Sequence, residues 1–172
     1  MTAIFYISAV VAIVATAMVI TRRNAVHALL YLIVSLLAAA VVFFTLGAPF
    51  VAALEVIVYA GAIMVLFIFV IMMLNLGQHT VAQESRWLTP GIWVGPSLLG
   101  TILLVEVILI CSRSAGSVTG QVQVSPSEVG ISLFSTYLVA VELASMLLLA
   151  GLVGAYHLGR RLKSGPAEED PS

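Results

Sequence analysis

The sequence predicts an all-α, polytopic membrane protein with five transmembrane helices. The chain is 62% hydrophobic and only 9% charged, whereas a soluble domain carries about 25% charged residues. Five apolar stretches approach or exceed the roughly 20 residues that cross a bilayer. They occupy residues 3–20, 25–46, 50–76, 90–111 and 131–158. Each should be a helix, because lipid offers backbone groups no hydrogen-bond partners.

The first two stretches have clear boundaries. A cleaved signal peptide places its basic residues before its apolar region, whereas Arg22 and Arg23 follow residues 3–20. We therefore expect that stretch to remain as the first spanning helix. Residues 25–46 end at Gly47-Ala48-Pro49. This connection is so short that the second and third helices must be antiparallel neighbours.

The remaining connections are longer and more polar. Trp87 and Trp93 flank the start of the fourth helix, as aromatic anchors at a membrane interface do. The spacing of Val118, Val122 and Val124 favours a short strand or hairpin after that helix. Residues 1–163 should form a single membrane domain. The acidic tail at residues 164–172 is expected to be disordered.

Basic residues predict the orientation, because cytoplasmic loops are enriched in Lys and Arg. With the N-terminus outside and the C-terminus inside, only Arg113 of the basic residues lies outside. The inner side then holds Arg22, Arg23, Arg86, Arg160, Arg161 and Lys163.

Composition also excludes several classes of function. A net charge of −1 argues against a nucleic-acid partner. Because Cys111 is the single cysteine, the chain has no internal disulfide and no Cys-based metal or iron–sulfur motif. No His pair has metal-ligand spacing, and no nucleotide-binding glycine loop is present. We expect no catalytic, cofactor-binding or metal site on this chain alone.

The third stretch carries the strongest functional signal. Glu55 and Tyr59 lie four residues apart, and therefore on one face of a helix. Gly61 lies between two alanines, which favours close helix packing or a backbone irregularity such as a π-bulge. An ionisable residue inside a membrane helix indicates function by default. These residues are therefore candidates for a proton path or its gating.

Two further carboxylates fall within expected helices. Glu142 lies deep in the fifth helix and is a fourth candidate for the proton path. Glu106 lies within two turns of the outer end of the fourth helix, from where it should reach the interface. For all of these residues the alternative interpretation is a hydrogen bond between helices.

The sequence also resembles a known family. The resemblance is carried by ALEVIVYAGAIMVLFIFVIMMLNL (residues 53–76), NAVHALLYLIVSLL (residues 24–37), RWLTPGIWVGP (residues 86–96) and residues 129–160. These segments resemble the subunit J family of the bacterial proton-pumping NADH:quinone oxidoreductase, respiratory complex I, whose mitochondrial counterpart is subunit 6. The likeness covers nearly the whole chain in order.

The resemblance implies a coupling subunit of the inner membrane. Members of this family have no cofactor of their own, whereas the parent complex holds FMN, iron–sulfur clusters and a quinone. They pack beside the subunits named K and A, between the quinone-chamber protein, named H, and the antiporter-like subunits N, M and L. Their third helix carries a π-bulge at the position matching Tyr59 to Gly61, and its rotation is proposed to gate a water wire. The main carboxylate relay belongs to the neighbour named K, so Glu55 would be an accessory group.

Two alternatives remain open on sequence grounds. One is a stand-alone small transporter or channel, which would be stable and would transport without partners. The other is a purely structural assembly subunit, for which pumping would survive the loss of every polar residue in the membrane.

Overall fold

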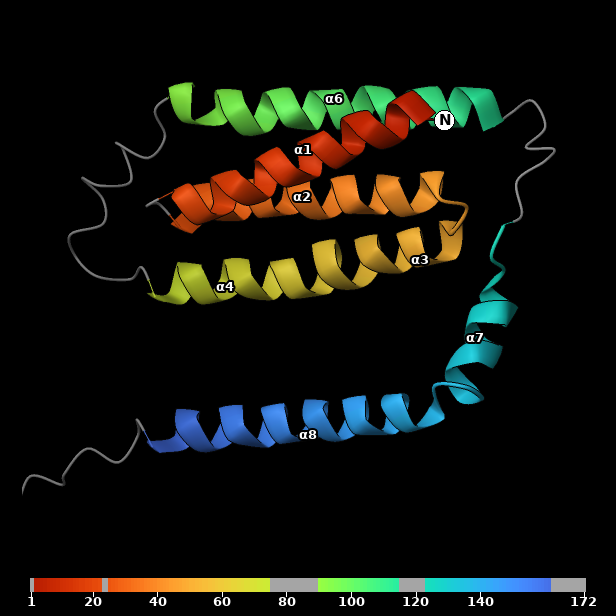
Figure 1. Ribbon diagram of the computed structural model, residues 1–172. Helices are drawn as coiled ribbons and strands as arrows, with labels where there is room; N and C mark the ends of the chain where they lie inside the picture. The colour runs from red at the N-terminus through yellow and green to blue at the C-terminus, as the bar shows by residue number, and fades with distance from the viewer. Residues whose placement is uncertain (1, 23–24, 75–89, 115–122, 162–172) are drawn as a thin grey trace, which may run out of the picture. The chain divides into compact units, whose positions relative to one another are not determined.

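The computed structural model describes residues 2–22, 25–74, 90–114 and 123–161. All regular elements in these ranges are helices (Figure 1). They are α1 (Thr2–Thr21), α2 (Ala25–Thr45), α3 (Pro49–Leu54), the π-helix η1 (Glu55–Ile63), α4 (Met64–Leu74), α6 (Pro90–Ser114), α7 (Pro126–Phe134) and α8 (Leu138–Arg161). Five stretches are long and apolar enough to cross a membrane, with α3, η1 and α4 together forming the third span. The predicted all-α class with five spans is therefore confirmed.

The chain divides into two compact units, residues 1–125 and 126–172. In the first unit α2 is the central helix. It packs against α1, against α6 and along the whole third span (Figure 1). The core lies where α1, α2 and α6 meet. Its buried members are Ile4, Val11, Ala15, Val34, Ala38, Val41, Leu103 and Ile110.

A glycine-based turn joins α2 to α3. Gly47 has a φ of 85°, a left-handed conformation that glycine adopts without steric cost. The amide of Gly47 donates to the carbonyl of Phe44, and the amide of Ala48 donates to that of Phe43, both at 3.1 Å. This pair of bonds is the Schellman motif, which satisfies the last carbonyls of a helix. Pro49 then begins α3. The expected antiparallel pairing of the second and third spans is confirmed, since α2 packs along all three segments of the third span.

The second unit corrects the expected fifth helix, because its spanning helix begins at Leu138 rather than near residue 131. Residues 126–134 form the separate helix α7, with proline at its first position. Ser135 donates its hydroxyl to the carbonyl of Ile131 at 2.5 Å. The amide of Tyr137 donates to the carbonyl of Ser132 at 3.1 Å. These bonds close α7 in a turn before α8 starts.

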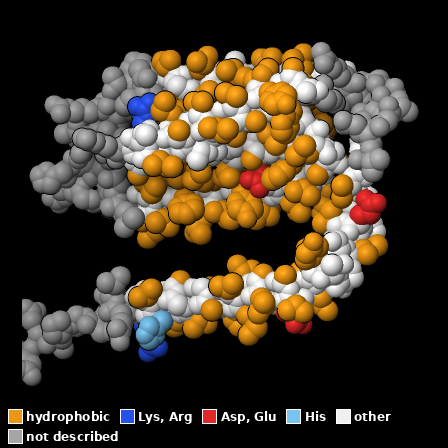
Figure 2. Space-filling model, viewed as in Figure 1, with side chains coloured by type: hydrophobic (Ala, Val, Ile, Leu, Met, Phe, Trp, Pro, Cys, Tyr) orange, Lys and Arg blue, Asp and Glu red, His pale blue; other side chains and the backbone are white. Residues whose placement is uncertain are grey.

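The region after the fourth span also differs from expectation. Helix α6 extends to Ser114, beyond the expected end at residue 111. Residues 123–125, including Val124, have no regular structure. The other two valines of the expected strand, and the expected disordered tail, lie outside the described residues. Hydrophobic side chains are spread over the visible face of each unit, as expected for helices that contact lipid (Figure 2).

Candidate functional site

A π-helix interrupts the third span. Nine residues of η1, Glu55–Ile63, wind with wider turns between the α-helical segments α3 and α4. All three sequence-predicted residues of this span lie in it: Glu55 begins η1, and Tyr59 and Gly61 follow. π-Helices are rare and frequently mark functional sites. The structure therefore confirms the backbone irregularity expected around Tyr59 to Gly61.

The structure gives a local reason for glycine at position 61. A Cβ atom built on Gly61 would lie 3.2 Å from the carbonyl oxygen of Val56, five residues earlier. No other atom is found within 4 Å of that Cβ position, the helix's own nearer backbone aside. Gly61 therefore relieves crowding inside its own π-turn. It does not make room for another described helix.

Glu55 and Tyr59 are open to the surroundings of this chain. The Tyr59 side chain is 50% exposed, and Glu55 is half-buried. Within the described ranges, neither side chain has a recorded hydrogen bond. A carboxyl and a phenol in apolar surroundings can hold water or protons.

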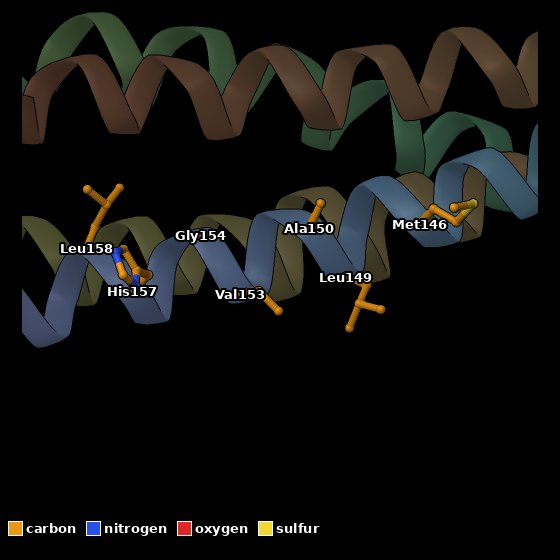
Figure 3. Close-up of a pocket in the computed structure, with 7 residues that line it drawn as sticks. All are labelled: Met146, Leu149, Ala150, Val153, Gly154, His157 and Leu158. Atoms are coloured by element: carbon orange, nitrogen blue, oxygen red, sulfur yellow. The ribbon is translucent and has the colours of Figure 1, made fainter.

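Glu142 lies in the second unit, on α8, where it is exposed. Its backbone carbonyl accepts a hydrogen bond from the Ser145 hydroxyl at 2.7 Å. The side-chain carboxyl takes no part in that bond. An open apolar hollow of about 660 Å³ lies further along the same helix (Figure 3). Because α8 alone supplies its lining residues, the hollow is a helix face rather than a closed binding site.

Glu106 is the residue that the sequence interpretation misplaced. It is 4% exposed rather than at the interface. The hydroxyl of Ser8, itself fully buried, donates to Oε2 of Glu106 at 2.7 Å. The expectation was wrong because Glu106 lies on the face of α6 that meets α1, where its carboxyl contacts Ser8. The missed signal was spacing: Leu103, Glu106 and Ile110 lie three and four residues apart, on one buried helix face.

A second polar contact joins α1 to α2. The hydroxyls of Thr16 and Ser35 lie 2.7 Å apart. Both hydroxyls also lie within hydrogen-bonding distance of the Ala12 carbonyl, at 2.8 and 3.3 Å. Because each hydroxyl has a single proton, one of them donates to Ala12 while the other donates to its partner hydroxyl. Such bonds are typical of helix pairs in membranes. In the part of the chain that the structure describes, no three His, Cys, Asp or Glu residues are grouped so as to hold a metal ion.

Comparison with known proteins decides the family. Residues 15–158 match the family of NADH-ubiquinone/plastoquinone oxidoreductase chain 6. The chain belongs to this family. It is 63% identical over 158 residues to NADH-quinone oxidoreductase subunit J of Pseudomonas aeruginosa, covering 91% of this chain and 95% of the relative.

More distant relatives carry the same name. The subunit J of Escherichia coli K12 is 56% identical over 161 residues, covering 94% of this chain and 88% of the relative. The subunit J of Buchnera aphidicola from Schizaphis graminum is 46% identical over 160 residues, covering 93% and 98%. The resemblance to subunit J is thus confirmed. As a member of the chain 6 family, this chain is a membrane subunit of complex I, and other complex I subunits are its partners.

Proposed function

We propose that this chain couples quinone reduction to proton translocation in complex I, through a gate in its third span. The observation that carries the proposal is η1, which places Glu55, Tyr59 and Gly61 in one π-helical segment. A π-turn and an α-turn are two arrangements of the same sequence. Exchange between them would reorient Glu55 and Tyr59 and so make or break a chain of waters beside them.

The proton path would use groups that exchange protons or order water. Glu55 is the exchangeable group at the start of η1, Tyr59 orders water beside it, and Gly61 permits the wide turn. Glu142 on α8 would serve the same path. These roles require water or neighbouring subunits, because Glu55 and Tyr59 have no recorded side-chain hydrogen bond within the described residues.

The redox chemistry would belong to other subunits. FMN, iron–sulfur clusters and quinone would be held by the parent complex, and this chain would bind none of them. Its neighbours would be the membrane subunits K, A, H and N, in the bacterial inner membrane. The isolated chain would have no catalytic activity.

The test is Gly61→Val in the assembled complex. The new side chain crowds the Val56 carbonyl and adds β-branching, both of which oppose the wide turn. We expect assembly to survive at least in part, while proton uptake per NADH oxidised in membrane vesicles falls. Glu55→Gln should be milder, because an amide keeps hydrogen bonds but releases no proton. Parental pumping by Gly61→Val would leave η1 with a packing role only.

Gly100→Ala is a control for the loss of a glycine within a span. Gly100 lies on α6, and a Cβ there meets nothing within 4 Å. We expect parental pumping from this variant. A fall equal to that of Gly61→Val would mean that loss of a glycine in any span is harmful, which would remove the support for a gate.

We also propose that the N-terminus faces outside and the C-terminus inside. In a Cys111→Ser background, Gln123→Cys should react with an impermeant thiol reagent added to intact cells, and Thr21→Cys should react only after the membrane is opened. Both native side chains are exposed. The reverse labelling pattern would invert the topology.

A further inference from the structure

The buried face of α6 contains a carboxyl group where packing calls for an apolar side chain. Glu106 lies between Leu103 and Ile110, which are 5% and 6% exposed and belong to the core. Opposite it, Ser8 lies between Ile4 and Val11 on α1. The members of this core are apolar, and no Lys or Arg is among the buried side chains of the described residues.

The two oxygens of the Glu106 carboxyl have different surroundings. Oε2 accepts the hydroxyl of Ser8 at 2.7 Å. Oε1 is buried and has no hydrogen-bond partner among the described residues. A buried polar atom without a partner is costly. Such atoms in native structures are commonly satisfied by an internal water.

Water suits Oε1 in both protonation states. An ionised carboxyl needs a donor at Oε1, and a neutral acid needs an acceptor for its O–H group. A water molecule can do either. The Ser8 hydroxyl can remain the donor to Oε2 in both states, so a change at Oε1 leaves the contact between α1 and α6 intact.

A hydrogen bond that only held α1 against α6 would not require a carboxyl here. A neutral amide accepts the same hydrogen bond from Ser8 without the cost of burying an ionisable group. We therefore propose that Glu106, with Ser8 on Oε2 and an internal water on Oε1, is a proton-carrying site inside the α1–α2–α6 bundle. On release the proton passes from Oε1 to the water, which gives up one of its own protons to water outside the bundle, and uptake reverses both transfers; no electron moves. The inference rests on the proposed function, because a stored proton has a use only if the assembled complex moves protons.

The first test is Glu106→Gln in the assembled complex, in membrane vesicles. The amide oxygen can still accept from Ser8, so the complex should assemble. The rate of proton uptake per assembled complex should fall by about tenfold or more, as for loss of a positioned proton-transfer group. Ser112→Ala is the control on the same helix, because that exposed hydroxyl bonds only to the Leu109 carbonyl at 3.0 Å. Parental pumping by Glu106→Gln would overturn the proposal.

The second test does not depend on the glutamine variant assembling. Infrared difference spectra of the oxidised and NADH-reduced complex should contain a carboxyl C=O band from Glu106. Ser8→Ala removes one hydrogen bond and should shift that band, whereas Ser112→Ala should not. A spectrum that Ser8→Ala leaves unchanged would refute a proton-carrying Glu106.

Comparison with Gly61→Val separates this inference from the gate in η1. A normal Glu106→Gln complex beside an impaired Gly61→Val complex would overturn the Glu106 site alone. An impaired Glu106→Gln complex beside a normal Gly61→Val complex would support the Glu106 site and overturn the gate.

Discussion

Polar side chains form hydrogen bonds between helices in the α1–α2–α6 bundle, whereas those of η1 in the third span do not within the described residues. In the bundle, Ser8 pairs with Glu106 and Thr16 pairs with Ser35, each across a helix interface. In η1, Glu55 and Tyr59 have no recorded side-chain hydrogen bond within the described residues, and Tyr59 is half exposed. The bundle largely completes its polar contacts within the chain. The polar contacts of η1 are left to partners beyond the described part of residues 1–125, such as water or other subunits.

The largest expected effect follows from this dependence on partners. Each considered within its own unit, the third span and α8 expose most of their apolar side chains, and α8 has no fully buried residue in its described part. Deleting the chain should therefore prevent assembly of the membrane-bound NADH:quinone reductase. Native electrophoresis and quinone-linked NADH oxidation measure this. An assembled, pumping complex in the deletion strain would show that neighbouring subunits do not need these surfaces.

The second-largest effect is expected from a substitution that adds a side chain where the bundle has no room for one. Tyr31 of α2 is 4% exposed, and a Cβ on Gly95 of α6 would overlap its hydroxyl. Gly95→Ala should lower stability by about 1–3 kcal/mol, as overpacking does, seen as a lower Tm of the complex. Gly100→Ala, in open space on the same helix, should be neutral or slightly stabilising. Equal Tm values for the two variants would contradict the packing of Tyr31 on Gly95.

A smaller effect is expected at the polar pair between α1 and α2. A double-mutant cycle with Thr16→Val and Ser35→Ala should give a coupling energy of about 0.6 kcal/mol, typical of hydrogen bonds between membrane helices. Thermal unfolding of the complex in mild detergent supplies the four stabilities. A coupling indistinguishable from zero would mean that the hydroxyls do not interact.

The smallest effect on stability is expected in η1. Tyr59→Phe removes a hydroxyl with no recorded partner in the described chain, so the free energy of unfolding should change by less than about 0.5 kcal/mol. Proton uptake per NADH oxidised should nevertheless fall, because the phenol is proposed to order water in the proton path. A large loss of stability with parental pumping would show that Tyr59 is a structural contact, like the polar pairs of the bundle, and has no role in the proton path.

The sequence predicted what length and hydrophobicity determine. The five spans and the antiparallel turn at Gly47 followed from apolar stretches and a short connection. It could not place Glu106, because burial there depends on which face of α6 meets α1. Nor did it separate α7 from α8, since residues 131–137 are apolar enough to continue a helix and the break is made by local hydrogen bonds.

The candidate site was predicted in part. Glu55, Tyr59 and Gly61 were identified from polar and small residues in an apolar helix, and they lie together in η1. The residues around Gly61 left the wide turn as one of two alternatives, and only the resemblance favoured it, because α and π geometry are compatible with one sequence. The functional roles of these residues, the role of Glu142 and the orientation of the chain remain predictions.

The two ends of η1 are held while its middle is not. Met64, which follows η1 directly, is 1% exposed and fixed by packing. At the other end, α3 is tied to α2 by the Gly47 turn. Because each α-helical residue turns the chain by about 100°, gaining or losing one residue in a turn would swing side chains by roughly that angle. With both ends fixed, the wide turn can only move along these nine residues, and the side chains that it passes would reorient. The Tyr59 side chain would then rotate about the helix axis while the helices on either side stay in place.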